Sequence, residues 1–245
     1  MKNSHRIIEI CTLSAFLMQG CATQTVDKLP DELYLEGEHS FQKGRYVDAV
    51  ADWKKVKESY KSPELSARAE IGIADAYFLN NDYIEAAAAY EDFRKLHPRH
   101  ELADYALFRQ GLSYFRQINR IDTDQTPVKN AVSILESYLK LSPGGAYIQE
   151  AQEKIRDSKD KQLQYEIYVG RFYLKAEKYP AAIARFEEAF RNFPGLKHMD
   201  ELLFYTGVAY REAGQKEKSR EVFDKLVREF PGSDYAAEAR KTAGN

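Results

Sequence analysis

Apolar and small residues recur every three or four positions along most of this chain, which predicts amphipathic helices. The pattern is clearest in residues 163–194, where two such helices are predicted to form an antiparallel hairpin. Gly170 and Ala182 are small where the two helices must approach closely, and Phe186 fills the space beside them. Pro194 stops the second helix. One hairpin cannot bury its apolar face alone, so we expect this unit to recur.

The same set of small, aromatic and proline positions recurs when the template is moved along the chain. Further copies start at Pro30, Ala67 and Asp200, and another starts near Asp104. The copy near Asp104 contains an insertion, residues 118–125, so its second helix arrives late. Five copies with shared anchor positions are the tetratricopeptide repeat (TPR) pattern. A generic bundle of amphipathic helices lacks these fixed small-residue and proline positions.

The repeats predict an all-α TPR solenoid of five helical hairpins with a C-terminal capping helix. Residues 31–145 are expected to hold repeats 1–3. Residues 146–245 are expected to hold a long connecting helix, repeats 4–5 and the capping helix. The connecting helix should run without a break over residues 146–176, because this charged segment contains no helix breaker before the fourth repeat. The capping helix is predicted over residues 233–242.

The N-terminus has a different pattern. Lys2 and Arg6 precede an apolar run at residues 7–18, and the run is followed by a small residue. A basic start, a short apolar stretch and a small residue are typical of a secretory signal peptide, here residues 1–20. The apolar run is short for a permanent bilayer-spanning helix.

Cys21 stands directly after Gly20, which resembles the lipobox of bacterial lipoproteins. We therefore predict lipidation of Cys21 and a lipidated N-terminal tether over residues 21–30. Ala22 stands where an aspartate usually favours the inner membrane, so the expected location is the periplasmic face of the outer membrane, held by the lipid. The alternative is ordinary secretion with Cys21 left as a free thiol. Cys11 leaves with the signal peptide, which excludes a disulfide in the mature chain.

Charge and motifs argue against several function classes. The formal net charge is -2, from 36 Lys and Arg against 38 Asp and Glu, which gives no electrostatic case for nucleic acid. Phosphate loops, zinc spacings and nucleophile elbows are missing from the sequence, so we predict no enzyme activity, no cofactor besides the lipid, and no metal. His97 and His100 are interpreted as capping a turn. Asp122 and Asp124 lack the further oxygen ligands of a calcium loop and are interpreted as structural.

Together these features resemble the BamD family, the TPR lipoproteins of the bacterial outer-membrane β-barrel assembly machinery. The resemblance covers the five hairpins and a set of local features, namely Cys21, His97-Pro98-Arg99-His100, Asp122-Thr123-Asp124-Gln125 and Tyr179-Pro180-Ala181-Ala182. The chain departs from the family at Met18 and Gln19 of the lipobox and at residues 142–145, and neither departure changes the layout.

The resemblance implies a scaffold in the assembly complex. It implies docking to the POTRA region of BamA through the C-terminal repeats and contact with unfolded barrel proteins through the N-terminal repeats. The other lipoproteins of the complex are further implied partners.

In a TPR, the first helix of each hairpin lines the concave surface. The inward template positions of repeats 1–3 are apolar, which predicts a groove for an extended substrate peptide. These residues are Tyr34, Phe41, Ile71, Phe78, Leu79, Phe108, Leu112 and Phe115. An alternative is that they pack against a neighbouring helix. The same positions in repeats 4–5 include charged residues, which we predict to dock a partner. These residues are Arg171, Lys175, Arg211 and Glu212.

Two other hypotheses remain open at this point. A periplasmic TPR adaptor of the CpoB type shares proline-ended repeats, although it normally carries a coiled-coil segment before them. The second hypothesis is an enzyme, an envelope hydrolase with a TPR-like body. The sequence offers it no nucleophile and base in a supporting context.

Overall fold

The computed structural model describes residues 28–59, 62–120 and 122–243. Within these ranges the chain is all-helical, with eleven α-helices and no strand. The helices are α1 (Pro30–Gln42), α2 (Tyr46–Ser59), α3 (Pro63–Leu79), α4 (Tyr83–Leu96), α5 (Ala103–Arg116), α6 (Thr126–Leu141), α7 (Ile148–Lys175), α8 (Tyr179–Asn192), α9 (Met199–Glu212), α10 (Lys216–Glu229) and α11 (Asp234–Ala243).

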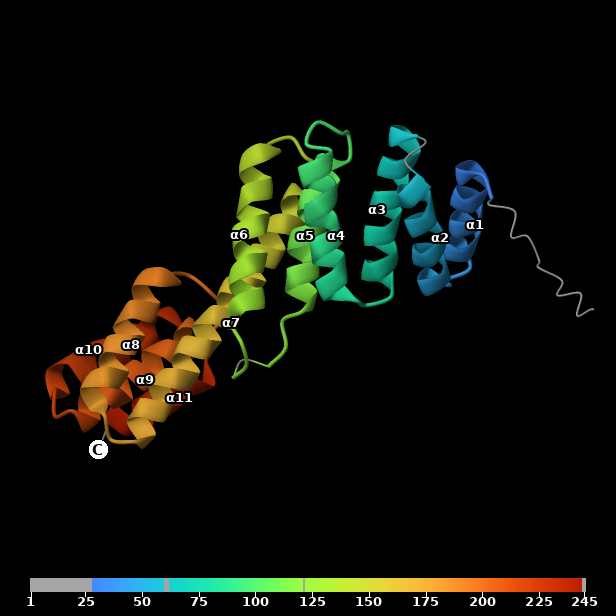
Figure 1. Cartoon of the computed structure of the whole chain (residues 1–245). Coiled ribbons are helices and arrows are strands. Elements are labelled where there is room, and N and C mark those ends of the chain that lie inside the picture. The colour runs from blue at the N-terminus through green and yellow to red at the C-terminus, as the bar shows by residue number, and fades with distance from the viewer. Residues whose placement is uncertain (1–27, 60–61, 121, 244–245) are drawn as a thin grey trace, which may run out of the picture.

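Successive helices pack as antiparallel hairpins that stack along one elongated body (Figure 1). The first three hairpins are α1–α2, α3–α4 and α5–α6. The C-terminal part of α7 pairs with α8, α9 pairs with α10, and α11 covers the end of the stack. This arrangement confirms the predicted TPR solenoid of five hairpins with a capping helix.

Each hairpin closes where a small residue on the first helix meets a large residue on the second. An added Cβ at Gly170 would lie 2.1 Å from Cε1 of Phe186, and one at Gly207 would lie 2.5 Å from Cε1 of Phe223. The remaining glycine contacts of this type are Gly37 on Trp53 and Gly111 on Leu135. Real Cβ contacts are never this short, so only glycine allows these helices to approach so closely.

The turn inside a hairpin also has a fixed backbone requirement. Four equivalent turn positions have positive φ, at 72° for Gly44, 66° for Asn81, 58° for Glu177 and 74° for Gly214. Glycine reaches this left-handed conformation without steric cost, asparagine tolerates it, and glutamate is strained there. The second and fourth hairpins therefore turn by the same geometry as the first and fifth, although they lack the glycine.

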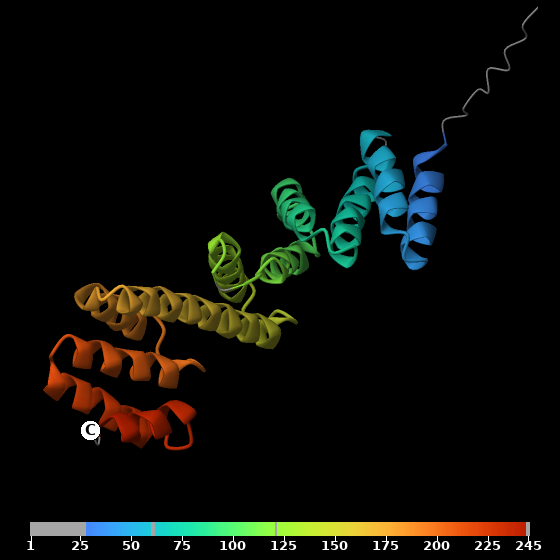
Figure 2. The same cartoon turned by 90° about the horizontal axis from the view of Figure 1, so that it is seen from below.

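The long helix α7 joins the two halves of the molecule (Figure 2). Its 28 residues cover most of the predicted span. Ala151 and Ile155 near its start belong to the hydrophobic core of repeats 2 and 3. Leu163 and Ile167 belong to the core of repeats 4 and 5. One rigid element therefore fixes the orientation of the C-terminal hairpins on the N-terminal ones.

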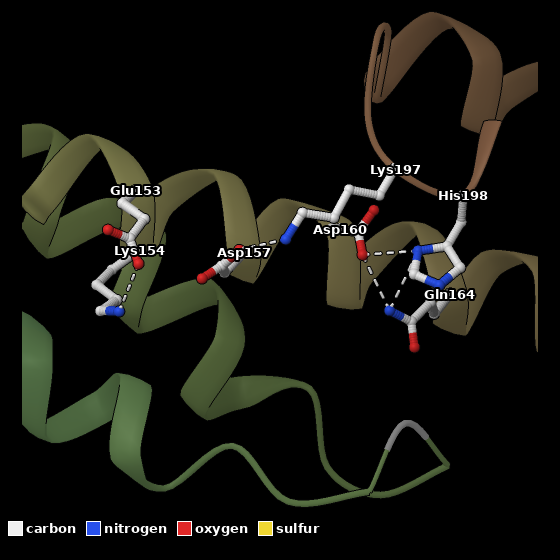
Figure 3. A network of polar contacts seen from close by, with 7 residues as sticks. All are labelled: Glu153, Lys154, Asp157, Asp160, Gln164, Lys197 and His198. Atoms are coloured by element: carbon white, nitrogen blue, oxygen red, sulfur yellow. Dashed lines mark hydrogen bonds and ion pairs between the residues drawn. The ribbon is translucent and has the colours of Figure 1, made fainter.

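Polar contacts hold the middle of α7, between these two cores. Figure 3 shows Lys197 and His198 reaching from the loop before α9 onto α7. His198 Nδ1 lies 2.7 Å from Asp160 Oδ2, and Lys197 Nζ lies 3.1 Å from Asp157 Oδ1. Gln164 donates a further hydrogen bond to Asp160 Oδ2 at 3.0 Å. We call Asp157, Asp160, Gln164, Lys197 and His198 the α7 clamp.

The buried carboxylate of the α7 clamp is kept ionised by its partners. Burial by itself raises the pKa of Asp160, but the hydrogen bonds from His198 and Gln164 and the charge of His198 outweigh it and lower the pKa. The α7 clamp therefore stabilises the junction of the two halves through a charged group that is only 5% exposed.

Candidate docking surfaces

An open hollow lies between the C-terminal part of α7 and α9, and exposed aromatic side chains stand in it. Phe172 is 65% exposed and Tyr168 is 47% exposed, and both line the hollow. They lie four residues apart on α7, so they share one face of the helix. Val208 of α9 lines the hollow from the other helix. Aromatic side chains left open to solvent at a concave surface are typical of interface anchors.

Charged groups surround these aromatic side chains. Arg171 Nη1 donates to Glu201 Oε1 at 3.2 Å, and its guanidinium lies 4.5 Å from the ring centroid of Tyr205. Lys175 and Glu212 also line the hollow. The C-terminal surface therefore combines apolar anchors with charges of both signs, which suits a specific protein partner.

The structure brings the predicted docking residues together. Arg171, Lys175 and Glu212 line one hollow, and Arg211 pairs with Glu212 at 2.8 Å. Sequence reasoning missed Tyr168 and Phe172, since neither occupies an inward template position. Their spacing of four residues in a helix otherwise rich in charge was the signal that could have identified them.

The predicted N-terminal groove residues are mostly in the core. We call the eight predicted groove residues the apolar stripe. Their burial leaves no open groove along most of the apolar stripe, because each following repeat covers the first helix of the repeat before it. The buried members are Tyr34, Ile71, Phe78, Phe108 and Leu112, each no more than 8% exposed.

Three members of the stripe keep some exposure. Leu79 is 45% exposed. Phe41 is half-buried and packs with its ring centroid 5.5 Å from that of Trp53. Phe115 is half-buried, with Lys154 Nζ 5.3 Å from its ring centroid. A ligand bound along this stripe can contact only Leu79, Phe41 and Phe115 unless the repeats separate.

A polar network crosses the stripe at the second and third repeats. Tyr90 and Tyr105 donate their hydroxyls to Asp75 Oδ1, at 2.5 Å and 2.7 Å. Arg109 donates through Nε to the Tyr90 hydroxyl at 3.1 Å, and its guanidinium lies 3.7 Å from the ring centroid of Phe78. Burial raises the pKa of Asp75, and the two tyrosine hydrogen bonds only partly offset it. The network ties α3, α4 and α5 together and covers Phe78.

The two turns considered as metal sites are held by protein contacts. His100 Nδ1 accepts from the backbone N–H of Leu102 at 3.1 Å, which is the predicted capping role. His97 Nε2 lies 2.7 Å from Glu70 Oε2. Asp124 Oδ1 accepts from the backbone N–H of Thr126 at 2.9 Å and fixes the start of α6. Across the described ranges there is no group of three or more His, Cys, Asp or Glu side chains that could hold a metal ion.

A family model described as "YfiO: Outer membrane lipoprotein" matches residues 26–224. The chain belongs to this family. The match spans all five hairpins except the end of the last one.

Several curated relatives of this chain are named "Outer membrane protein assembly factor BamD", which confirms the resemblance to the BamD family. The protein from Vibrio cholerae is 27% identical over 82% of this chain and 89% of its own length. The protein from Caulobacter vibrioides is 29% identical over 93% of this chain and 77% of its own length. The protein from Rickettsia prowazekii is 28% identical over 87% of this chain and 85% of its own length.

The predicted lipid site of this chain lies outside the described residues. Cys21, the signal peptide and most of the tether fall within residues 1–27. Among the helices that the structure describes, none is both long and apolar enough to cross a membrane.

Proposed function

We propose that this protein is a non-enzymatic scaffold of outer-membrane β-barrel assembly. The family match over residues 26–224, with relatives named as outer membrane protein assembly factors, carries the proposal. A lipid on Cys21 holds the protein at the periplasmic face of the outer membrane, and no other cofactor is needed. The solenoid supplies an elongated surface on which several partners bind at once.

The hollow between α7 and α9 docks the BamA-like barrel assembly protein. Phe172 and Tyr168 offer large apolar area with few rotatable bonds, so ordering them on binding costs little entropy. Arg171 is held by Glu201 and Tyr205 beside them, which keeps its charge in one place for a partner carboxylate. Exposed aromatic and arginine side chains at the centre of a concave patch are the usual carriers of binding energy.

The first three repeats contact unfolded outer-membrane proteins. The surface available to them is narrower than the stripe predicted from sequence, because only Leu79, Phe41 and Phe115 keep exposed area. Accessory lipoproteins of the assembly complex bind elsewhere on the solenoid.

A pulldown from detergent-solubilised envelopes tests the docking proposal. Tagged wild-type protein should recover the BamA-like protein, and Phe172→Ala should recover at least tenfold less of it, because the main apolar anchor is lost. Ile84→Ala is the matched control, since Ile84 is 70% exposed on α4, away from the hollow. Equal recovery with Phe172→Ala and wild type contradicts docking at the hollow. Recovery of Tol-Pal components in place of the barrel protein supports the adaptor hypothesis instead.

A further inference from the structure

The capping helix α11 packs against α9, the helix that lines one side of the hollow described above (Figure 1). Ala236 and Ala239 of α11 are fully buried and share a core with Leu203 and Phe223. The middle of α11 is therefore held in place by apolar contacts. α11 lies beyond residues 26–224, so the family match assigns it no role.

The start of α11 is attached to the start of α9 beside Glu201. Ser233 Oγ donates to Asp200 Oδ2 at 2.5 Å, and Asp200 Oδ1 accepts from the backbone N–H of Glu201 at 2.9 Å. Ser233 Oγ also accepts from the backbone N–H of Tyr235 at 3.1 Å, which fixes the first turn of α11. This turn is therefore held close to Glu201.

The Tyr235 side chain reaches Glu201 itself. Burial, the negative charge of Glu201 and a side-chain hydrogen bond with Glu201 raise the pKa of Tyr235 to about 12. The tyrosine is neutral at physiological pH, so its hydroxyl donates to the carboxylate. Its ring packs on α9, with the ring centroid 5.4 Å from that of Phe204 and 6.1 Å from that of Tyr205. The ring contacts and the hydroxyl contact are separate, so Tyr235→Phe removes only the hydroxyl contact.

Glu201 also holds Arg171 in the hollow. Arg171 Nη1 donates to Glu201 Oε1 at 3.2 Å, and the guanidinium lies 4.5 Å from the ring centroid of Tyr205. The Arg171 side chain is 51% exposed, whereas that of Glu201 is 16% exposed. An exposed arginine has many accessible rotamers, so the position of its charge depends on these two neighbours. Tyr235 contacts both of them.

We propose that Tyr235 is a positioning residue for the docking surface between α7 and α9. Its hydroxyl fixes the Glu201 carboxylate, and Glu201 in turn fixes the guanidinium of Arg171 beside Phe172. The guanidinium is then ordered before the partner arrives, so binding loses less side-chain entropy. An oriented guanidinium matches a partner carboxylate with two parallel hydrogen bonds. The inference rests on the proposed docking at this hollow and adds α11 to the elements that determine it.

The mobility of Arg171 in the purified full-length protein tests the positioning step without any partner. Nuclear magnetic resonance relaxation of its side-chain Nε–H group reports how tightly the guanidinium is held, and Arg171→Lys assigns the signal. We expect Tyr235→Phe and Glu201→Gln to lower the order parameter of this group. Tyr210→Phe is the matched control, because the Tyr210 hydroxyl donates at 2.5 Å to Glu187 Oε1 on α8, away from the hollow. An unchanged order parameter in Tyr235→Phe overturns the proposal.

The pulldown from detergent-solubilised envelopes tests whether this order serves docking. Tyr235→Phe should raise the bait concentration that recovers half of the BamA-like protein by about fivefold, a usual size for coupling between contacting residues. In an Arg171→Gln background the same change should have no further effect, because Tyr235 acts through Arg171. Tyr210→Phe should leave recovery unchanged. Equal losses from Tyr235→Phe in both backgrounds indicate a general effect on the fold and overturn the proposal.

Phe172→Ala in the same pulldown separates failure of this inference from failure of the proposed docking. Reduced recovery with Phe172→Ala but full recovery with Tyr235→Phe overturns the role of Tyr235 and leaves the docking proposal intact. Full recovery with Phe172→Ala contradicts docking at the hollow, whereas the effect of Tyr235 on Arg171 is still decided by the relaxation measurement, which needs no partner.

Discussion

At the residue scale, the hairpins depend on glycine facing a large side chain. Gly170 meets the ring of Phe186 in the fourth hairpin, and Gly207 meets the ring of Phe223 in the fifth. In the second hairpin, Ala74 and Tyr90 occupy the same positions and both are fully buried. The second hairpin therefore accommodates one methyl group at this position.

We predict that Gly170→Leu destabilises the protein. The new Cβ alone would lie 2.1 Å from Phe186, so the ring or the helix must move, and such overpacking costs about 1–3 kcal/mol or more. Thermal unfolding followed by circular dichroism measures the loss. Gly232→Leu is the control, because an added Cβ there meets no atom within 4 Å. Equal melting temperatures for Gly170→Leu and wild type contradict the packing argument.

Glu177→Gly should have the opposite effect. Glu177 turns the fourth hairpin at a φ of 58°, a left-handed conformation that strains a glutamate. Relief of this strain exceeds the extra backbone entropy of glycine, so we expect about 0.5–1 kcal/mol of stabilisation in urea unfolding. The reciprocal change, Gly214→Ala at the equivalent turn, should destabilise by a similar amount. A lower midpoint for Glu177→Gly contradicts this account of the turn.

At the element scale, α7 decides how the two halves are joined. The sequence predicts its continuity, because the charged segment contains no glycine or proline before Gly170. The α7 clamp was not predicted, since Asp160 and His198 lie 38 positions apart and only the return of the chain before α9 brings them together.

We predict that Asp160 makes stability pH-dependent in the acid range. The lowered pKa of Asp160 means that its charged form stabilises the fold. This contribution is present above the unfolded pKa of about 3.9 and is lost as the pH falls through the lower folded pKa. Asp160→Asn should therefore cost about 1 kcal/mol at neutral pH, and its difference from wild type should vanish in stronger acid.

Denaturant unfolding at a series of pH values measures this effect. Glu153→Gln is the control on the same helix, because Glu153 is exposed and, among the described residues, its one ion pair is with the adjacent Lys154. A constant difference between Asp160→Asn and wild type down to the lowest pH contradicts the role given to the ionised carboxylate.

At the scale of the whole molecule, the lipid that we propose on Cys21 is the feature that attaches the solenoid to the membrane. Acyl chains contribute about 0.8 kcal/mol per buried methylene, so several chains hold a soluble body at the bilayer. We predict that Cys21→Ser releases the protein from membranes or leaves the precursor unprocessed. Membrane fractionation and the intact mass measure this. An unchanged mature mass with unchanged fractionation contradicts lipidation.

The sequence by itself determined the repeats, their turns and their close contacts. Each of these depends on residues within one hairpin, as with Gly170 and Phe186, and short-range geometry follows from helical spacing. It also pointed to the charged C-terminal surface that includes Arg171.

Only the tertiary structure decided which apolar residues remain open. Phe78 and Phe172 both lie on first helices of hairpins, yet one is 8% and the other 65% exposed. Periodicity shows which face of a helix is apolar, but the area left uncovered depends on the angle at which the next repeat packs.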